Sequence, residues 1–170
     1  MTRKFALYVS AGFLMISCAA GEAQQAGGSD DHHAHVNQRG DHVMGFSHEK
    51  ATHHFRLYED GGAIEVEANE RTDTATRDQI RMHLSHIARM FADGNFRAPM
   101  LIHDQVPPGV ATLQRLKQKI SYRSEDTDRG GRIVITTSDP EALKALHKFL
   151  RFQITDHQTG DSTEVMARPS

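Results

Sequence analysis

The chain of 170 residues contains a single cysteine, Cys18, and no tryptophan. One cysteine cannot form an intrachain disulfide, and it cannot supply the several thiolates of a cysteine-based metal site. Because Cys18 lies in a segment that is expected to be processed, it offers no thiol nucleophile to the folded domain either. The fold must therefore be stabilised by an ordinary apolar core.

Clustered positive charge is also missing. The chain has 20 Lys and Arg residues and 22 Asp and Glu residues, so its formal net charge is −2. The positive residues form no basic block or stripe. Phosphate binding needs such clusters, so nucleic acid is not an expected partner. The chain also lacks a Gly-x-Ser-x-Gly elbow, a Walker loop, a His-Glu-x-x-His pair and a Cys-x-x-Cys-His haem attachment. No catalytic residue can be named from the sequence.

The first apolar run of the chain is too short to span a bilayer. Arg3 and Lys4 precede apolar residues 5–16, and Ser17-Cys18 follows. This order is typical of a signal peptide, here residues 1–17. Met15-Ile16-Ser17-Cys18 resembles a bacterial lipobox, with Met15 in place of the preferred leucine. If Cys18 is not lipidated, the small residues that follow it suit an ordinary signal peptidase.

This N-terminus predicts an exported protein. A lipidated Cys18 would carry more than one acyl chain and would anchor the protein stably to a membrane. Ala19 after the cysteine, where an aspartate is absent, resembles lipoproteins sorted to the outer membrane. We therefore expect the protein on the periplasmic face of a bacterial membrane, with the outer membrane favoured, or in the soluble periplasm.

Residues 18–51 show no apolar periodicity and predict a flexible linker. Ala, Gln, Gly, Ser, Asp and His dominate this stretch, which includes Asp-Asp-His-His-Ala-His at 30–35, then His42 and His48. Such a tract can bind Zn, Cu or Ni weakly and without fixed geometry. It can equally be a solvated tether, and both interpretations stay open.

Residues 52–158 predict a single folded domain. Alternating apolar residues indicate strands at 54–58 and 64–68, joined by a tight Asp60-Gly61 turn. A helix follows, capped by Asp73 or Thr74 and ended before Gly94. Its predicted buried stripe has helical spacing and consists of Ile80, Leu84, Ile87 and Phe91.

The rest of the domain predicts an insert and a second unit like the first. The insert is a short extended segment at 99–103 and a helix at 110–119, separated by Pro107-Pro108-Gly109. Strands at 120–124 and 132–137 then precede a helix that starts at Asp139-Pro140. The predicted buried residues of this last helix are Leu143, Leu146, Phe149 and Leu150.

The predicted fold class is α+β, with an antiparallel sheet built from two ββα units. The helices pack on one face of the sheet, and a strand–helix insert lies between the units. Residues 159–170 predict a disordered tail.

Twelve histidines are the unusual feature of the composition. His83 and His86 lie three residues apart on a predicted helix and project from one side of it. If both ββα units run in the same direction, six histidines converge at one end of the domain, whereas His157 lies at the opposite end. The six candidate metal ligands are His53, His54, His83, His86, His103 and His147. Asp104 is a candidate ligand, or a group that orients one of the histidines.

Imidazole suits Zn, Cu, Fe and Ni, so the cluster predicts a bound transition-metal ion. Export favours copper or zinc over iron, and Met82, Met90 and Met100 could supply a thioether to copper. Non-covalent haem with an axial histidine stays open, with His83, His86 and Met90 as its place. Taken one at a time, each histidine also has an ordinary structural explanation in a strand, a loop or a helix boundary.

Three functions remain open at this point. The first is a metal-binding protein of the cell envelope, and the second is a small His-ligated metalloenzyme with an open coordination position. The third is an interaction domain without metal whose histidines respond to acid as they gain charge.

Several short stretches between His53 and Asp161 resemble a known group of proteins. They are His-His-Phe, Arg-Asp-Gln-Ile-Arg-Met-His-Leu-Ser-His-Ile, Pro-Pro-Gly-Val and Leu-Arg-Phe-Gln-Ile. In them the chain resembles histidine-rich exported bacterial proteins of unsettled function, some of which carry a transcarbamylase label. The chain lacks the Ser-Thr-Arg-Thr loop and the His-Pro-x-Gln segment of transcarbamylases and is too short for their two domains. The resemblance implies no established site residue.

Overall fold

Two β-hairpins, each followed by a helix, form the centre of the computed structural model, which describes residues 27–169. The predicted signal peptide and Cys18 lie outside the described residues. In chain order the elements are α1 (Gly27–Met44), the 3-10 helix η1 (His48–Lys50), β1 (Ala51–Tyr58), β2 (Gly61–Ala68), α2 (Thr74–Ala92), α3 (Arg97–His103), α4 (Val110–Arg115), the 3-10 helix η2 (Lys117–Lys119), β3 (Ile120–Asp126), β4 (Gly130–Thr137) and α5 (Pro140–Asp156).

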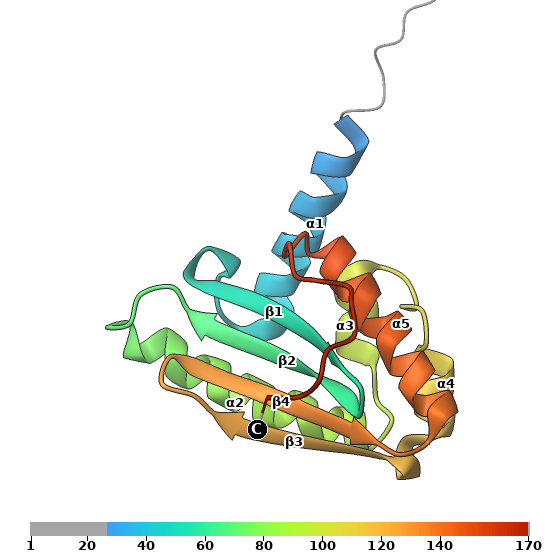
Figure 1. Ribbon diagram of the computed structural model, residues 1–170. Helices are drawn as coiled ribbons and strands as arrows, with labels where there is room; N and C mark the ends of the chain where they lie inside the picture. The colour runs from blue at the N-terminus through green and yellow to red at the C-terminus, as the bar shows by residue number, and fades with distance from the viewer. Residues whose placement is uncertain (1–26, 170) are drawn as a thin grey trace, which may run out of the picture.

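The four strands form one antiparallel sheet in the order β1-β2-β4-β3 (Figure 1). Helix α2 packs mainly on β3 and β4, and α5 packs mainly on β1 and β2. Both helices cover the same face, because Gly62 and Gly131, which share that face, lie against Leu150 of α5 and Leu84 of α2. The predicted α+β class, an antiparallel sheet of hairpins with helices packed against it, is confirmed.

The second ββα unit runs opposite to the first, and this differs from the sequence prediction. Strands β2 and β4 are antiparallel neighbours, so Gly61 pairs with Thr136 and Glu67 pairs with Gly130. Helix α5 therefore starts at the end of the sheet where β1 stops and finishes at the end where β1 begins. The assumption that both units run in the same direction is wrong. As a result, His157 lies at the end of the sheet where β1 begins, and His147 lies at the end where β1 stops.

The core lies between the sheet and the two helices. The predicted stripe of α2 is buried, and so are Leu146, Phe149 and Leu150 of α5. The helix starts also agree with the sequence: the Asp73 carboxylate accepts from the Thr76 amide, and that of Asp139 accepts from two amides of α5. Local signals thus placed both central helices.

The insert between the two units consists of two helices instead of a strand and a helix. Residues 99–103, predicted as extended, belong to α3. Pro99 is compatible with this helix because it lies in the first turn, where a backbone N–H has no intrahelical partner to lose. The predicted helix at 110–119 is α4 followed by the 3-10 helix η2.

The stretch predicted as a flexible linker contains helix α1, whose N-terminal end projects away from the sheet (Figure 1). Its C-terminal half packs on α3, with Val36 fully buried and the Arg39 Nε donating to the Ile102 carbonyl at 2.7 Å. The buried or half-buried residues of α1 have helical spacing, and they are Val36, Gly40, Val43 and Met44. The polar composition of the stretch hid this pattern in the sequence. Helix α1 thus becomes one wall of the region described below.

The chain after α5, predicted as a disordered tail, runs beside the free edge of β1. The Met166 amide donates to the Leu57 carbonyl and the Glu59 amide donates to the Met166 carbonyl, each at 3.0 Å. The Arg168 guanidinium lies 4.4 Å from the centre of the Tyr58 ring. The tail therefore occupies an edge that would otherwise be open for pairing with another chain.

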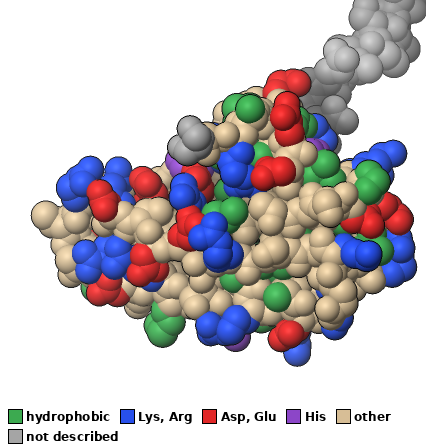
Figure 2. Space-filling view, turned by 60° about the horizontal axis from the view of Figure 1, so that its bottom comes forward, with side chains coloured by type: hydrophobic (Ala, Val, Ile, Leu, Met, Phe, Trp, Pro, Cys, Tyr) green, Lys and Arg blue, Asp and Glu red, His purple; other side chains and the backbone are tan. Residues whose placement is uncertain are grey.

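Charges of both signs are intermixed on the surface. Figure 2 shows Lys and Arg side chains next to Asp and Glu side chains over the face in view, without a large block of one sign. On the sheet, Glu125 pairs with both Arg123 and Arg132. This arrangement agrees with the absence of a basic stripe in the sequence.

Candidate functional site

An apolar pocket that includes three histidines lies between the sheet strands β1 and β2 and the helices α1, α2, α3 and α5. Its walls are carbon side chains from the sheet and the helices, and its polar members are three imidazoles and one amide. The described lining residues are Met44, His53, Phe55, Ile64, Val66, His83, Leu84, Ile87, Phe91, Ala98, Pro99, Ile102, Phe149, Gln153 and His157. We call this region the histidine pocket. A more polar hollow of about 290 Å³ adjoins it and shares Met44, His53 and His157.

His53 reaches the pocket because it lies on the core side of β1. Side chains alternate along a strand, so His53 shares its face with Phe55 and Leu57, which are both buried. Its ring stacks on His157, with ring centroids 5.8 Å apart and an interplanar angle of 8°. The ring of Phe46 stacks near it at 6.4 Å. The His53 ring is therefore nearly parallel to two neighbouring rings.

His83 lines the pocket from α2. It is half-buried and meets Phe46 edge to face, with ring centroids 5.7 Å apart. Phe46, which is 6% exposed, thus contacts both His53 and His83. The aromatic ring brings two imidazoles from different elements to the same apolar surface.

Burial keeps both of these imidazoles neutral at neutral pH. Loss of hydration lowers the pKa of His53 from 6.5 to about 4, and the neighbouring His83, His54 and His48 lower it further. Loss of hydration likewise lowers the pKa of His83 to about 4, with a smaller contribution from His86. Neutral imidazoles keep a nitrogen lone pair, so both rings are able to bind a cation without first losing a proton.

His103 and the end of α5 form a buried polar group behind His157. His103 is 1% exposed, and its ring lies 4.9 Å from that of His157. Its Nδ1 is 2.5 Å from the Asp156 carboxylate, and its Nε2 is 3.0 Å from the Gln153 side-chain oxygen. Burial would raise the pKa of Asp156, but hydrogen bonds from His103 and His32 outweigh it and lower that pKa. Both ring nitrogens of His103 are therefore engaged.

Gln153 leaves one buried polar atom without a partner among the described residues. The residue is 4% exposed, and its Nε2 makes no hydrogen bond there. Turning the amide by half a revolution would let the NH2 group donate to His103, but the oxygen would then be the unpaired atom. In either orientation, a buried amide that lines the histidine pocket has unused hydrogen-bonding capacity.

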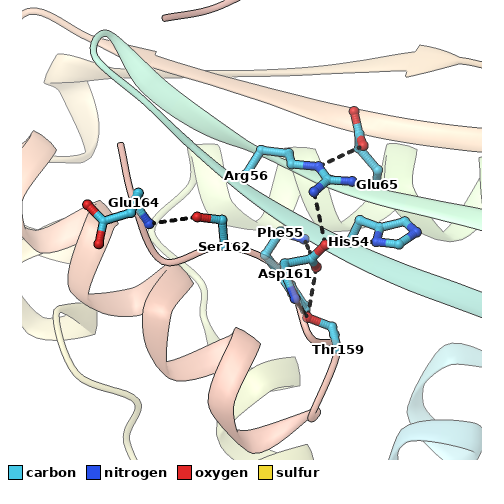
Figure 3. Close-up of polar contacts among 8 residues, drawn as sticks. All are labelled: His54, Phe55, Arg56, Glu65, Thr159, Asp161, Ser162 and Glu164. Atoms are coloured by element: carbon cyan, nitrogen blue, oxygen red, sulfur yellow. Dashed lines mark hydrogen bonds and ion pairs between the residues drawn. The ribbon is translucent and has the colours of Figure 1, made fainter. Parts of the chain in front are cut away.

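Of the six histidines that the sequence predicted to converge, His53 and His83 line the histidine pocket, and His103 lies next to it, against His157. His54 points to the other face of the sheet, where its Nδ1 lies 3.0 Å from the Asp161 carboxylate (Figure 3). His86 is exposed on α2. These two residues are therefore outside the histidine pocket.

His147 and Asp104 also lie elsewhere. His147 is buried at the far end of the sheet, where its Nε2 is 3.0 Å from the carbonyl oxygens of both Tyr58 and Gly61. Two carbonyl acceptors require a proton on that nitrogen, so it has no free lone pair. Asp104 is exposed at the left-handed end of α3, and the carboxylate that contacts His103 is Asp156 instead.

His157, predicted at the opposite end of the domain, lies beside His53 instead, so that prediction is wrong. Because the second unit is reversed, the end of α5 meets the start of β1, and His157 contacts His53 and Phe55. The sequence did contain a signal for it. Phe149, Gln153 and His157 are spaced four apart and continue the buried stripe of α5 with polar side chains.

The imidazoles stack on one another and do not point at a common centre. Within residues 27–169, no group of three or more His, Cys, Asp or Glu side chains is arranged to hold a metal ion. Two imidazoles bound to one tetrahedral ion have ring centroids about 5 Å apart, given metal–nitrogen bonds of about 2.0–2.1 Å. The His53–His157 separation of 5.8 Å is close to that value. Coordination would thus require the rings to turn about their side-chain bonds.

Comparison with protein-family models, with curated proteins and with solved structures finds no match for this chain. Among the described residues, no helix has both the length and the apolar character needed to cross a bilayer. The chemistry of the histidine pocket is the remaining guide to function.

Proposed function

We propose that the protein is an exported binding protein for a transition-metal ion, which it holds through His53, His83 and His157. The observation that carries this proposal is that three imidazoles, from β1, from α2 and from the end of α5, line one apolar pocket. The basic start, short apolar run and Ser17-Cys18 of the N-terminus support export and a membrane anchor.

The protonation states favour this function. Metal binding normally competes with protons for the imidazole nitrogen. His53 and His83 have a pKa of about 4, so protons do not compete for them at neutral pH. The neutral state that burial gives these rings is the state in which an imidazole nitrogen can bind a metal ion.

The surroundings favour binding at a defined position. Apolar walls exclude water from the ion and strengthen each bond to it. His103 does not serve as a ligand, because Asp156 and Gln153 engage both of its nitrogens. It packs against the ring of His157 and orients that ring.

The test is metal titration of the mature chain after removal of bound metal with a chelator. In all proteins compared, alanines replace His32, His33 and His35, so that residues 30–35 offer no imidazole to the metal. We expect calorimetry to show one equivalent of tightly bound Cu or Zn. His53→Ala, His83→Ala and His157→Ala should each weaken binding at least about tenfold, since loss of even an outer partner of a ligand commonly costs that much.

His86→Ala is the matched control, because His86 lies on the same helix as His83 but is exposed. Its affinity should equal that of the parent protein. Circular dichroism should show that every variant keeps its fold. A parent protein that binds neither Cu nor Zn would refute the proposal, as would an equal loss of affinity in His86→Ala and His83→Ala.

A further inference from the structure

We infer that the ion is copper in its reduced, monovalent state and that the thioether of Met44 is a further ligand. This inference rests on the proposed function and specifies the cargo of the same site. Met44 is the last residue of α1 and lines both the histidine pocket and the hollow next to it, together with His53 and His157. It supplies the one sulfur among the described lining residues of the histidine pocket.

The local chain places Met44 beside the histidine pocket. Gly45 follows Met44 with a φ of 79°, a left-handed conformation that ends α1 and turns the chain. The next residue, Phe46, is 6% exposed and packs on both His53 and His83. Met44 therefore lines the same pocket as the two imidazoles that Phe46 contacts.

The charge of the donors indicates a monovalent ion. The described lining of the histidine pocket and of the adjoining hollow contains no Asp or Glu. Imidazole and thioether donors are neutral, so nothing in the lining compensates the charge of a bound cation. The cost of placing an ion in an apolar surrounding rises with the square of its charge, so a divalent ion costs about four times as much as a monovalent one.

The softness of the donors indicates the same ion. Thioether sulfur selects Cu(I) among the common biological metals, whereas Zn²⁺ takes thiolate, imidazole or carboxylate ligands. Imidazole also binds copper well. A set of imidazoles with one thioether therefore suits Cu(I) better than it suits Zn²⁺ or Fe²⁺.

Met44 also covers apolar residues of the core, and this role has to be separated from ligation. Leucine has nearly the same volume and covers the same surface, but it has no sulfur. Met44→Leu therefore isolates the contribution of the thioether. Met82→Leu is the control, because Met82 is 70% exposed on α2 and lines neither cavity.

The experiment is a competition titration under anaerobic conditions with a chromophoric Cu(I) chelator, beside a titration with Zn²⁺, in the mature chain with alanines at His32, His33 and His35. We expect one Cu(I) per chain, bound at least about a hundredfold more tightly than Zn²⁺. Met44→Leu should weaken Cu(I) at least about tenfold and change Zn²⁺ affinity less than about twofold, because only Cu(I) uses the sulfur. X-ray absorption should show a copper–sulfur bond that Met44→Leu lacks and Met82→Leu keeps.

The outcomes separate the two proposals. Binding of neither metal refutes the proposed function and the copper assignment together. Zn²⁺ binding that depends on His53 and His83, with no preference for Cu(I) and no effect of Met44→Leu on either metal, refutes the copper assignment and leaves the metal-binding function standing.

Discussion

The neutral, buried imidazoles of His53 and His83 should make the metal-free domain sensitive to mild acid. In the folded protein the pKa of each is about 4, against 6.5 for an ordinary histidine. Between these values the unfolded chain binds more protons than the folded chain, so protons favour unfolding. The stabilisation is fully present above about pH 6.5 and is lost as the pH falls toward about 4.

The size of the effect follows from the two pKa values. For one such imidazole, lowering the pH from about 7 to about 5 reduces the free energy of unfolding by about 2 kcal/mol. Two independent imidazoles would reduce it by about 3 to 4 kcal/mol, which is a large share of the ~5–15 kcal/mol that stabilises an average domain. Asp156 and Asp161 add little in this window, because their lowered pKa values place their titration at more acidic pH.

The assay is urea unfolding in the presence of a chelator, followed by far-UV circular dichroism because the chain has no tryptophan. His83→Gln should remove about half of the loss in stability between about pH 7 and pH 5, since one of the two titrating rings is gone. His86→Gln, which changes an exposed ring on the same helix, should keep the full loss. Equal pH dependence in the parent protein and in His83→Gln would refute the reasoning.

Two further predictions concern residues outside the histidine pocket. His147→Ala should lower the free energy of unfolding by about 1–3 kcal/mol, because the carbonyls of Tyr58 and Gly61 lose their buried donor, but metal affinity measured by calorimetry should not change. A loss of metal binding in a folded His147→Ala protein would contradict the assignment. Asp161→Ala should also cost about 1–3 kcal/mol in urea unfolding, because its carboxylate accepts from the Phe55 amide and from the Arg56 side chain, each at 2.9 Å (Figure 3). Unfolding midpoints identical to those of the parent protein would show that the tail contributes nothing.

Elements with strong local signals could be predicted from the sequence. The first hairpin was visible from the Asp60-Gly61 turn and the alternation on either side of it. The starts of α2 and α5 were visible from Asp73 and from Asp139-Pro140. In each case the signal lies within a few residues of the element that it specifies.

Elements that depend on a distant partner were missed. Helix α1 has a polar composition and only a weak apolar stripe. That stripe is buried where α1 packs on α3 around Val36, a contact with a distant part of the chain. Helix α3 was hidden by Pro99, which predicts a break in the middle of a helix but is tolerated in a first turn. Whether a proline falls in the first turn or in the middle of a helix depends on where that helix begins.

The candidate site shows the same division. His53 on the core face of β1 and the polar residues on the buried stripe of α5 follow from periodicity, which depends only on the covalent chain. Whether His147 or His157 joins His53 depends on how the two hairpins pair. That choice involves contacts between strands about 70 residues apart in sequence, and local patterns do not encode their direction. The amino-acid order alone thus determined that His53 shares a face of its strand with Phe55 and Leu57, and the antiparallel contact of β2 with β4 decided that His157, not His147, meets it.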